Sequence, residues 1–170
     1  AGKYDKKRFE FQANVLATII AEEVKTLAAA GNRTEYTPTA MFSWQPFNTP
    51  NFRLKGFYKS IFRMPTFNDL YYTFIGNTNL RPEYTKQYDF GFNYNTHFLS
   101  GSLKNFSIQT DVYYNQVKDK IVAVPTLNLF RWTMLNLDAV SIKGLETNIK
   151  TLWLINRFEL STSLNYTFER

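Results

Sequence analysis

The sequence contains no cysteine and only one histidine among its 170 residues. The missing cysteine excludes a disulfide-stapled scaffold and every metal site that is built from thiolates. The lone histidine, His97, has no cluster of carboxylates near it in the sequence. We therefore predict no metal site and no cofactor.

The sequence also lacks the motifs of catalysis. It has no recognisable nucleophile–base pair and no glycine-rich phosphate loop. The acidic residues Asp89, Asp111, Glu146 and Glu159 are spaced along expected strands and are not paired as a catalytic dyad. We therefore predict that the chain is not an enzyme.

No hydrophobic run approaches the roughly 18 apolar residues of a transmembrane helix. Aromatic residues nevertheless make up 18% of the chain, and they are spread out in alternation with polar residues. Two architectures use aromatic residues in this way: a β-sandwich, and a β-barrel that is apolar outside and wet inside. The net charge of +6 comes from basic residues that lie mainly at strand ends and in turns. They form no cluster interleaved with aromatic residues, so no nucleic-acid partner is predicted.

Alternation of period two is clearest between residues 83 and 95. Tyr84, Tyr88, Phe90, Phe92 and Tyr94 share one face, and polar residues such as Gln87 and Asp89 share the other. Similar patterns predict about seven antiparallel strands, at about 8–22, 34–44, 52–62, 82–95, 106–115, 139–153 and 158–168. The composition of residues 22–30 also favours a helical turn, so both possibilities stay open there.

The predicted connections alternate in length. The long ones cover about 25–34, 63–81 and 117–138, and the short ones cover about 45–51, 97–104 and 155–157. In an up-and-down meander, alternate connections lie at the same end, so all the long loops would gather at one end. Transmembrane barrels show this asymmetry, whereas a Greek-key sandwich has no reason to show it. Aromatic residues flank the short turns, as in an interfacial girdle: Trp44, Phe52, Tyr94, Phe106, Trp153 and Phe158.

Several motifs resemble a known family. Residues 62–72 read FRMPTFNDLYY, residues 76–83 read GNTNLRPE, and residues 87–91 read QYDFG. Further on, NLD at 136–138 is followed by IKGLE at 142–146. In this order the motifs resemble the barrel region of TonB-dependent outer-membrane receptors, most strongly between about residues 36 and 150.

The resemblance implies a 22-stranded transmembrane barrel filled by an N-terminal plug. Such receptors import siderophore-bound iron, haem, cobalamin or oligosaccharide across the bacterial outer membrane, and TonB supplies energy through the plug. The sequence does not name the ligand. We find no plug, TonB box or closing strand in it, so we interpret residues 1–170 as a partial receptor barrel that would not transport alone. The alternative is an extracellular β-sandwich module for adhesion or glycan binding.

Candidate ligand-binding residues lie in two of the loops. In the first loop a guanidinium suits a carboxylate or phosphate, and aromatic rings stack on flat ligands. The candidates there are Arg63, Phe67, Tyr71 and Tyr72. In the second loop they are Phe130, Arg131 and Trp132. Because the first run recurs in the family while ligands differ, we favour the interpretation that Arg63, Asp69 and Glu83 anchor that loop to the wall.

Overall fold

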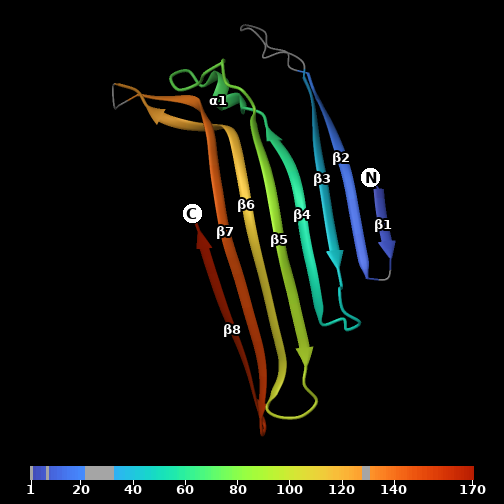
Figure 1. Cartoon of the computed structure of the whole chain (residues 1–170). Helices are drawn as coiled ribbons and strands as arrows, with labels where there is room; N and C mark the ends of the chain where they lie inside the picture. Colours follow the sequence, from blue (N-terminus) through green and yellow to red (C-terminus); the bar gives the residue numbers. More distant parts are fainter. Residues whose placement is uncertain (1, 7, 22–32, 128–130) are drawn as a thin grey trace.

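The computed structural model describes residues 2–6, 8–21, 33–127 and 131–170. Its eight described strands form one antiparallel sheet in which each strand pairs with its neighbour in the sequence (Figure 1). The strands are β1 (Gly2–Lys6), β2 (Phe9–Ile20), β3 (Arg33–Trp44), β4 (Phe52–Arg63), β5 (Glu83–His97), β6 (Leu103–Pro125), β7 (Trp132–Ile155) and β8 (Phe158–Glu169). A short helix, α1 (Phe67–Tyr71), follows β4. None of the helices among these residues is long and apolar enough to cross a membrane.

The predicted all-β up-and-down meander is confirmed, but the strand count differs. The additional strand is β1, whose Tyr4 pairs with Phe11 of β2. Its five residues include only one large apolar side chain. That is too little alternation for a strand to be recognised from the sequence.

The predicted long loop over residues 117–138 is wrong. β6 and β7 continue as a paired hairpin from Lys120 opposite Leu137 to Pro125 opposite Trp132, which leaves only residues 126–131 as a connection. The hairpin bends sideways beyond the rest of the sheet (Figure 1). Asp119, with a φ of 55°, lies where the regular pairing is interrupted. This bend breaks the alternation on which the sequence prediction depended.

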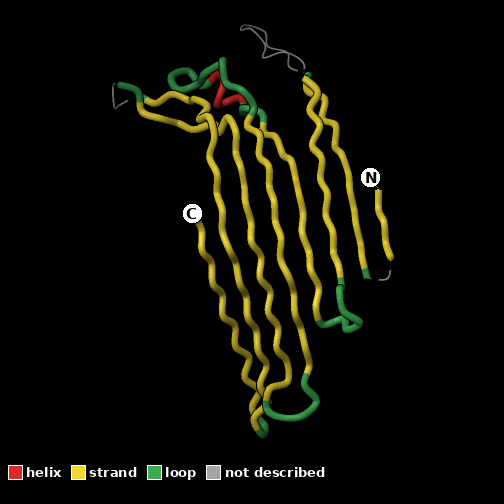
Figure 2. Tube along the Cα trace, viewed as in Figure 1, coloured by secondary structure: helices red, strands yellow, loops and turns green. Residues whose placement is uncertain are grey.

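Of the three long connections predicted at one end of the sheet, only the one predicted over 63–81 is confirmed, as residues 64–82. The connection over 64–82, which contains α1, and the tip of the β6–β7 hairpin lie at one end, which we call the loop end (Figure 2). The connections over 45–51, 98–102 and 156–157 lie at the other, the turn end. The expected loop over 25–34 and the helix question at 22–30 fall almost entirely outside the described residues.

The strand register separates two faces. Facing residues on one side form an apolar row across all eight strands: Tyr4, Phe11, Phe42, Gly56, Phe90, Val112, Leu145 and Phe168. The neighbouring row on the other side is mostly polar: Asp5, Glu10, Ser43, Lys55, Gly91, Asp111, Glu146 and Thr167. We call these sides the apolar face and the polar face.

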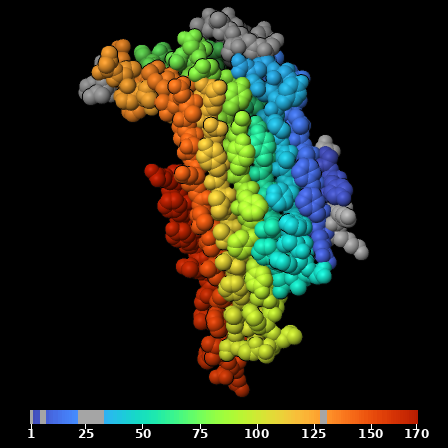
Figure 3. Space-filling model, in the orientation of Figure 1, coloured from blue at the N-terminus to red at the C-terminus, as the bar shows by residue number. Residues whose placement is uncertain are grey.

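The apolar face is not buried against a second sheet among the described residues. Phe90 is 53% exposed and Phe168 is 53% exposed, both on strands of this sheet. A β-sandwich would bury this face as its core, so the sandwich alternative does not describe this fold. β5–β8 also extend further toward the turn end than β1–β4 (Figures 1 and 3), a stagger typical of tilted barrel strands.

Candidate functional site

The loop between β4 and β5 begins with a capped helix. Thr66 accepts a hydrogen bond from the Asp69 backbone N–H through Oγ1 (3.2 Å), and Asp69 Oδ2 accepts one from the Thr66 N–H (2.8 Å). This reciprocal pair is a capping box, which satisfies N–H groups that an isolated helix start leaves open. It fixes α1 although the helix is only five residues long.

A glycine closes the loop behind the helix. The Gly76 N–H donates to the Tyr72 carbonyl at 2.7 Å. A Cβ at position 76 would lie 2.7 Å from both the Leu70 carbonyl oxygen and the Tyr72 nitrogen, which are backbone atoms that cannot move aside. Only glycine therefore fits where the chain folds back over α1.

The loop is docked on the β6–β7 hairpin by backbone and side-chain hydrogen bonds. The Met134 N–H donates to the Ile75 carbonyl (3.0 Å), and Asn77 Nδ2 donates to the Met134 carbonyl (2.9 Å). Beneath these bonds, Leu70 and Leu80 of the loop are buried with Ile121 of β6. The loop and the hairpin thus share the small hydrophobic core of the described chain.

Asn136 of β7 extends this docking to the end of the loop. Its Oδ1 accepts from the Arg81 N–H at 2.9 Å, and its Nδ2 donates to the Arg81 carbonyl at 2.9 Å and to the Asp119 carbonyl at 2.7 Å. One amide side chain thereby replaces a backbone partner for Arg81 and holds the bend of β6. The Asp119 carboxylate is buried and pairs with the Arg81 guanidinium at 2.6 Å.

Glu83 joins the loop to both neighbouring strands. Its Oε2 accepts from Arg63 Nη2 at 3.2 Å and from the Ile121 N–H at 3.1 Å. Arg63 Nη1 also lies 3.9 Å from Asp69 Oδ2. These contacts support the interpretation that Arg63, Asp69 and Glu83 anchor the loop, whereas a ligand-binding role of Arg63 stays a prediction.

The exposed aromatic residues of this loop differ in their surroundings. Phe67 and Tyr72 are 73% and 57% exposed, and neither is part of the buried core. Tyr71 packs against the core, and its ring centroid lies 5.0 Å from that of Phe67. Phe74, which the sequence analysis did not single out, is 82% exposed. The loop therefore presents aromatic surface at the loop end of the sheet.

The second group of predicted residues lies at the tip of the β6–β7 hairpin. Arg131 is exposed, and its carbonyl accepts from the Thr126 N–H at 2.8 Å. Trp132 is 47% exposed, two residues from Met134, to which the first loop is docked. The third predicted residue, Phe130, lies outside the described residues.

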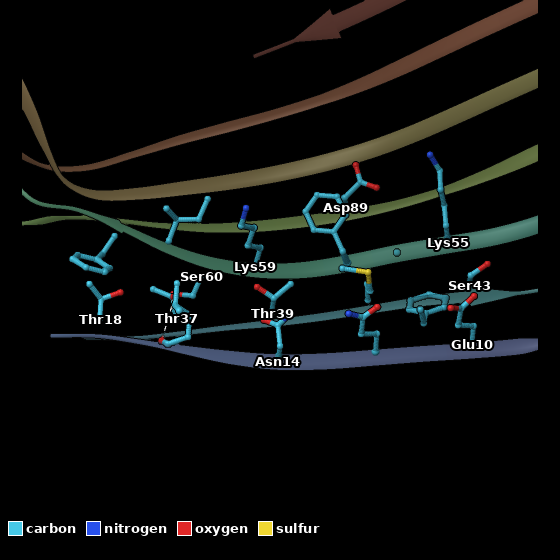
Figure 4. Close-up of a pocket in the computed structure, with 18 residues that line it drawn as sticks. Glu10, Asn14, Thr18, Thr37, Thr39, Ser43, Lys55, Lys59, Ser60 and Asp89 are labelled. Carbon is cyan, nitrogen blue, oxygen red and sulfur yellow. Dashed lines mark hydrogen bonds between the residues drawn. The ribbon is translucent and has the colours of Figure 1, made fainter. Parts of the chain in front are cut away.

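A groove of about 1030 Å³ runs along the polar face of β2–β5 (Figure 4). Lys55, Lys59 and Asp89 line it, together with apolar side chains that include Met41 and Phe57. Met41 and Phe57 face each other across β3 and β4. The groove is not predicted from the sequence, although Met41 and Phe57 are apolar positions within an otherwise polar set.

The groove widens because β3 and β4 separate toward the loop end. Their pairing stops at Thr39 opposite Lys59, whereas β3 stays paired with β2 as far as Arg33. Pro38 stands next to the point of separation and has no N–H to donate to a neighbouring strand. Tyr84 of β5 reaches toward this gap, and its hydroxyl donates to Glu35 Oε1 of β3 at 2.7 Å.

No group of three or more histidine, cysteine or carboxylate side chains suited to a metal ion occurs among the residues that the structure describes. The loop end and the groove offer aromatic rings, charged side chains of both signs and hydrogen-bonding groups. Such surfaces bind ligands by stacking and charge.

Residues 1–170 match the family model of the TonB dependent receptor-like β-barrel over their whole length. The chain belongs to this family. The motifs quoted from the sequence therefore identify the family correctly. In the structure they supply the capped loop, its glycine and its Asn136 contact.

Curated relatives include two proteins named vitamin B12 transporter BtuB. The one from Vibrio vulnificus is 36% identical over 85 residues, and the one from Photobacterium profundum is 32% identical over 85 residues. Each match covers 50% of this chain and 13% of the relative. The matched region is thus a small part of those transporters.

Solved structures of the same fold include a copper transporter, OprC, with a TM-score of 0.64, 14% identity and coverage of 99% of this chain and 28% of that one. The Serratia marcescens hemophore receptor HasR, in complex with its hemophore and heme, has a TM-score of 0.63 and 14% identity. The match covers 94% of this chain and 30% of that one. The FrpB iron transporter from Neisseria meningitidis has a TM-score of 0.62 and 14% identity, and the match covers 99% of this chain and 24% of that one. At these identities the similarity establishes the fold.

Proposed function

We propose that this chain is part of the wall of a bacterial outer-membrane receptor that imports a scarce nutrient. The observation that carries the proposal is the division of one family-typical sheet into an exposed apolar face and a polar face. An apolar outer surface suits lipid, and a polar inner surface suits a hydrated or plug-filled lumen. The role is binding and passage of a ligand, without catalysis.

The rest of the barrel follows from the open edges of the sheet. β1 and β8 each pair on one side only, and unpaired edges cannot persist in hydrocarbon. We infer that further strands close the barrel, to 22 as in the family, and that a plug carries the contact with TonB. Residues 1–170 then constitute a partial barrel domain.

The nutrient belongs to the class that the receptor family imports: ferric siderophore, haem, cobalamin or oligosaccharide. The names of the relatives include vitamin B12, heme, iron and copper. Ligand contact is assigned to the exposed aromatic residues at the loop end, Phe67 and Tyr72, together with Arg131 and Trp132 of the hairpin. Arg63, through its ion pairs, and Tyr71, through its packing on the core, position that surface.

The test is growth of a strain that lacks the full-length receptor. We expect growth to fail when one of these nutrients is limiting, and to return with the receptor only when TonB is active. Binding of cobalamin, haem and a ferric siderophore to the purified receptor then identifies the ligand. Normal growth on every nutrient, combined with a receptor that stays dispersed without detergent, would contradict the proposal.

A further inference from the structure

The apolar face carries three lysines in the loop-end half of the sheet. Lys86 of β5 alternates with Tyr84 and Tyr88, Lys118 of β6 faces Tyr84, and Lys143 of β7 faces Tyr114. All three lysines are exposed. They therefore project from the side that the fold gives to lipid.

None of these lysines forms an ion pair with a carboxylate among the described residues. In the register, most paired Asp and Glu residues of the described strands alternate with the apolar row, but the Glu35 carboxylate reaches Tyr84, the partner of Lys118. The ion pairs found in the described residues involve other cations. Within the part of the chain that the structure describes, no ion pair therefore neutralises the charge of the three lysines.

The lysines lie in or just beyond a row of tyrosines. Tyr58, Tyr88 and Tyr114 are neighbours across β4, β5 and β6, with ring centroids 5.1 Å and 6.2 Å apart. Lys143 continues this row on β7, while Lys86 lies two residues beyond Tyr88 toward the loop end. Tyrosine rings mark membrane interfaces, and lysine stems cover apolar surface while their amines reach the headgroups.

The height of Lys86 fits the border of the headgroup layer. Thr96 and Phe106 face each other near the turn end, and ten residues separate Thr96 from Lys86 along β5. Ten residues extend about 34 Å along a strand, which is about 26 Å across a membrane at a strand tilt of roughly 40°. The apolar band of such barrels is about 25 Å tall. Lys86 therefore lies at its upper border.

We propose that Lys86, Lys118 and Lys143 form a binding surface for the phosphate groups of anionic lipid headgroups in the leaflet at the loop end. Lys86 and Lys118 are diagonal neighbours, about 7–8 Å apart, so two amines can reach one phosphate. Charge complementarity selects the partner, because the surface offers three cations that form no ion pair with the described carboxylates. The proposal rests on the membrane placement given under Proposed function, and it does not depend on which nutrient is imported.

The experiment measures lipid retained by the full-length receptor in detergent. The probes are micelles that contain diphosphorylated lipid A and, separately, micelles that contain phosphatidylethanolamine, with bound lipid quantified by mass spectrometry. We expect the parent protein to retain lipid A preferentially. Because each basic residue near an anionic surface contributes about fivefold in binding, each lysine-to-glutamine change should weaken retention about fivefold, and the triple variant most.

Lys59→Gln is the matched control. Lys59 faces Gln87 in β5, next to Lys86, but it lies on the polar face. This variant loses the same charge and should retain lipid A as the parent does. A triple lysine-to-arginine variant keeps the charge and should also retain the lipid, which separates charge from folding.

Three results would overturn the proposal of a lipid-binding surface. They are unchanged retention in the folded triple glutamine variant, an equal loss in Lys59→Gln, and retention of phosphatidylethanolamine equal to that of lipid A. Displacement of lipid A by millimolar inorganic phosphate would likewise overturn it, since the site would then bind free phosphate. Nutrient uptake is measured separately, so a receptor that retains lipid A but imports none of the nutrients contradicts the proposed function alone.

Discussion

Lys55 Nζ lies 2.7 Å from Asp111 Oδ1, although the whole of β5 lies between their strands. The residue between them is Gly91, which is the register partner of both. A Cβ at position 91 would overlap the Asp111 Oδ1 and the Thr110 carbonyl oxygen. The absence of a side chain thus lets an ion pair span three strands on the polar face.

The same arrangement occurs at a second glycine. Gly144 lies between Tyr113 and Glu169 in the register, and the Tyr113 hydroxyl donates to Glu169 Oε2 at 2.8 Å across it. A Cβ there would lie 2.5 Å from Tyr113 Cζ. A glycine in the middle strand therefore lets side chains of the two outer strands contact each other, and these contacts hold the three strands together on the polar face.

Gly91→Ala should destabilise the barrel by about 1–3 kcal/mol, the usual range for overpacking, because Asp111 must move and the ion pair with Lys55 must lengthen. The measurement is urea unfolding of the full-length receptor in lipid vesicles. Gly2→Ala is the control, since a Cβ at Gly2 meets nothing within 4 Å. Equal stability of both variants would show that the polar face adapts freely at Gly91.

Phe90→Arg should destabilise the membrane-inserted receptor by about 2–4 kcal/mol if Phe90 faces the bilayer midplane. Phe90 is 53% exposed and belongs to the apolar row. The matched change is Gln109→Arg on β6, because Gln109 is exposed on the polar face and its new guanidinium can pair with nearby Asp111. Unfolding in vesicles should separate the two variants, and similar losses would contradict the assignment of the faces.

Asn136→Ala should loosen the loop over residues 64–82. The change removes three hydrogen bonds. Water can replace the partner of the exposed Arg81 groups, but the part-buried Asp119 carbonyl loses this partner at a cost of about 1–3 kcal/mol. Hydrogen exchange of the loop amides should accelerate while the strands stay protected. Asn79→Ala, an exposed position in the same loop, should leave exchange unchanged. Unaltered protection in Asn136→Ala would mean that the hydrophobic core alone holds the loop.

The two faces were predictable because they depend on period-two alternation, which is local. Phe90 and Asp89 take opposite faces in the structure as the pattern requires. The loop over 64–82 was predictable from its proline and asparagine residues, and its family motif was recognised. The membrane-facing lysines were not, because Lys86, Lys118 and Lys143 come together only through the register of three strands.

The extension of β6 and β7 was not predictable for a physical reason. Ile121 is buried beneath the docked loop, and the backbone bends at Asp119, so the residues beyond the bend show no regular contrast between faces. Asn136 and Arg81 are 55 residues apart in sequence, and no local pattern links them. Their motif residues were noted in the sequence, but their contact depends on the fold.

Phe67→Ala distinguishes ligand contact from loop bracing. The Phe67 ring is 73% exposed, so its loss should leave the hydrogen exchange of residues 64–82 unchanged. If the ring stacks on the imported ligand, affinity should fall by about 0.5–1.5 kcal/mol, or roughly two- to twelvefold.

Arg63→Gln should have the reverse effect: hydrogen exchange of the loop should accelerate, and ligand affinity should stay unchanged. The substitution removes the ion pairs of Arg63 with Glu83 and Asp69. Because the Arg63 side chain is half exposed, the free energy of opening the loop should fall by about 1 kcal/mol or less.

Phe74→Ala serves as the control for Phe67→Ala, because Phe74 is an exposed aromatic residue of the same loop outside the predicted ligand set. Affinity is measured by titrating the identified nutrient onto the full-length receptor, and protection by exchange on the same samples. Faster exchange with unchanged affinity in Phe67→Ala would make Phe67 a brace through its contact with Tyr71. A drop in affinity confined to Arg63→Gln, with exchange unchanged, would instead make the guanidinium the ligand contact, since its ion pairs would then contribute nothing to holding the loop.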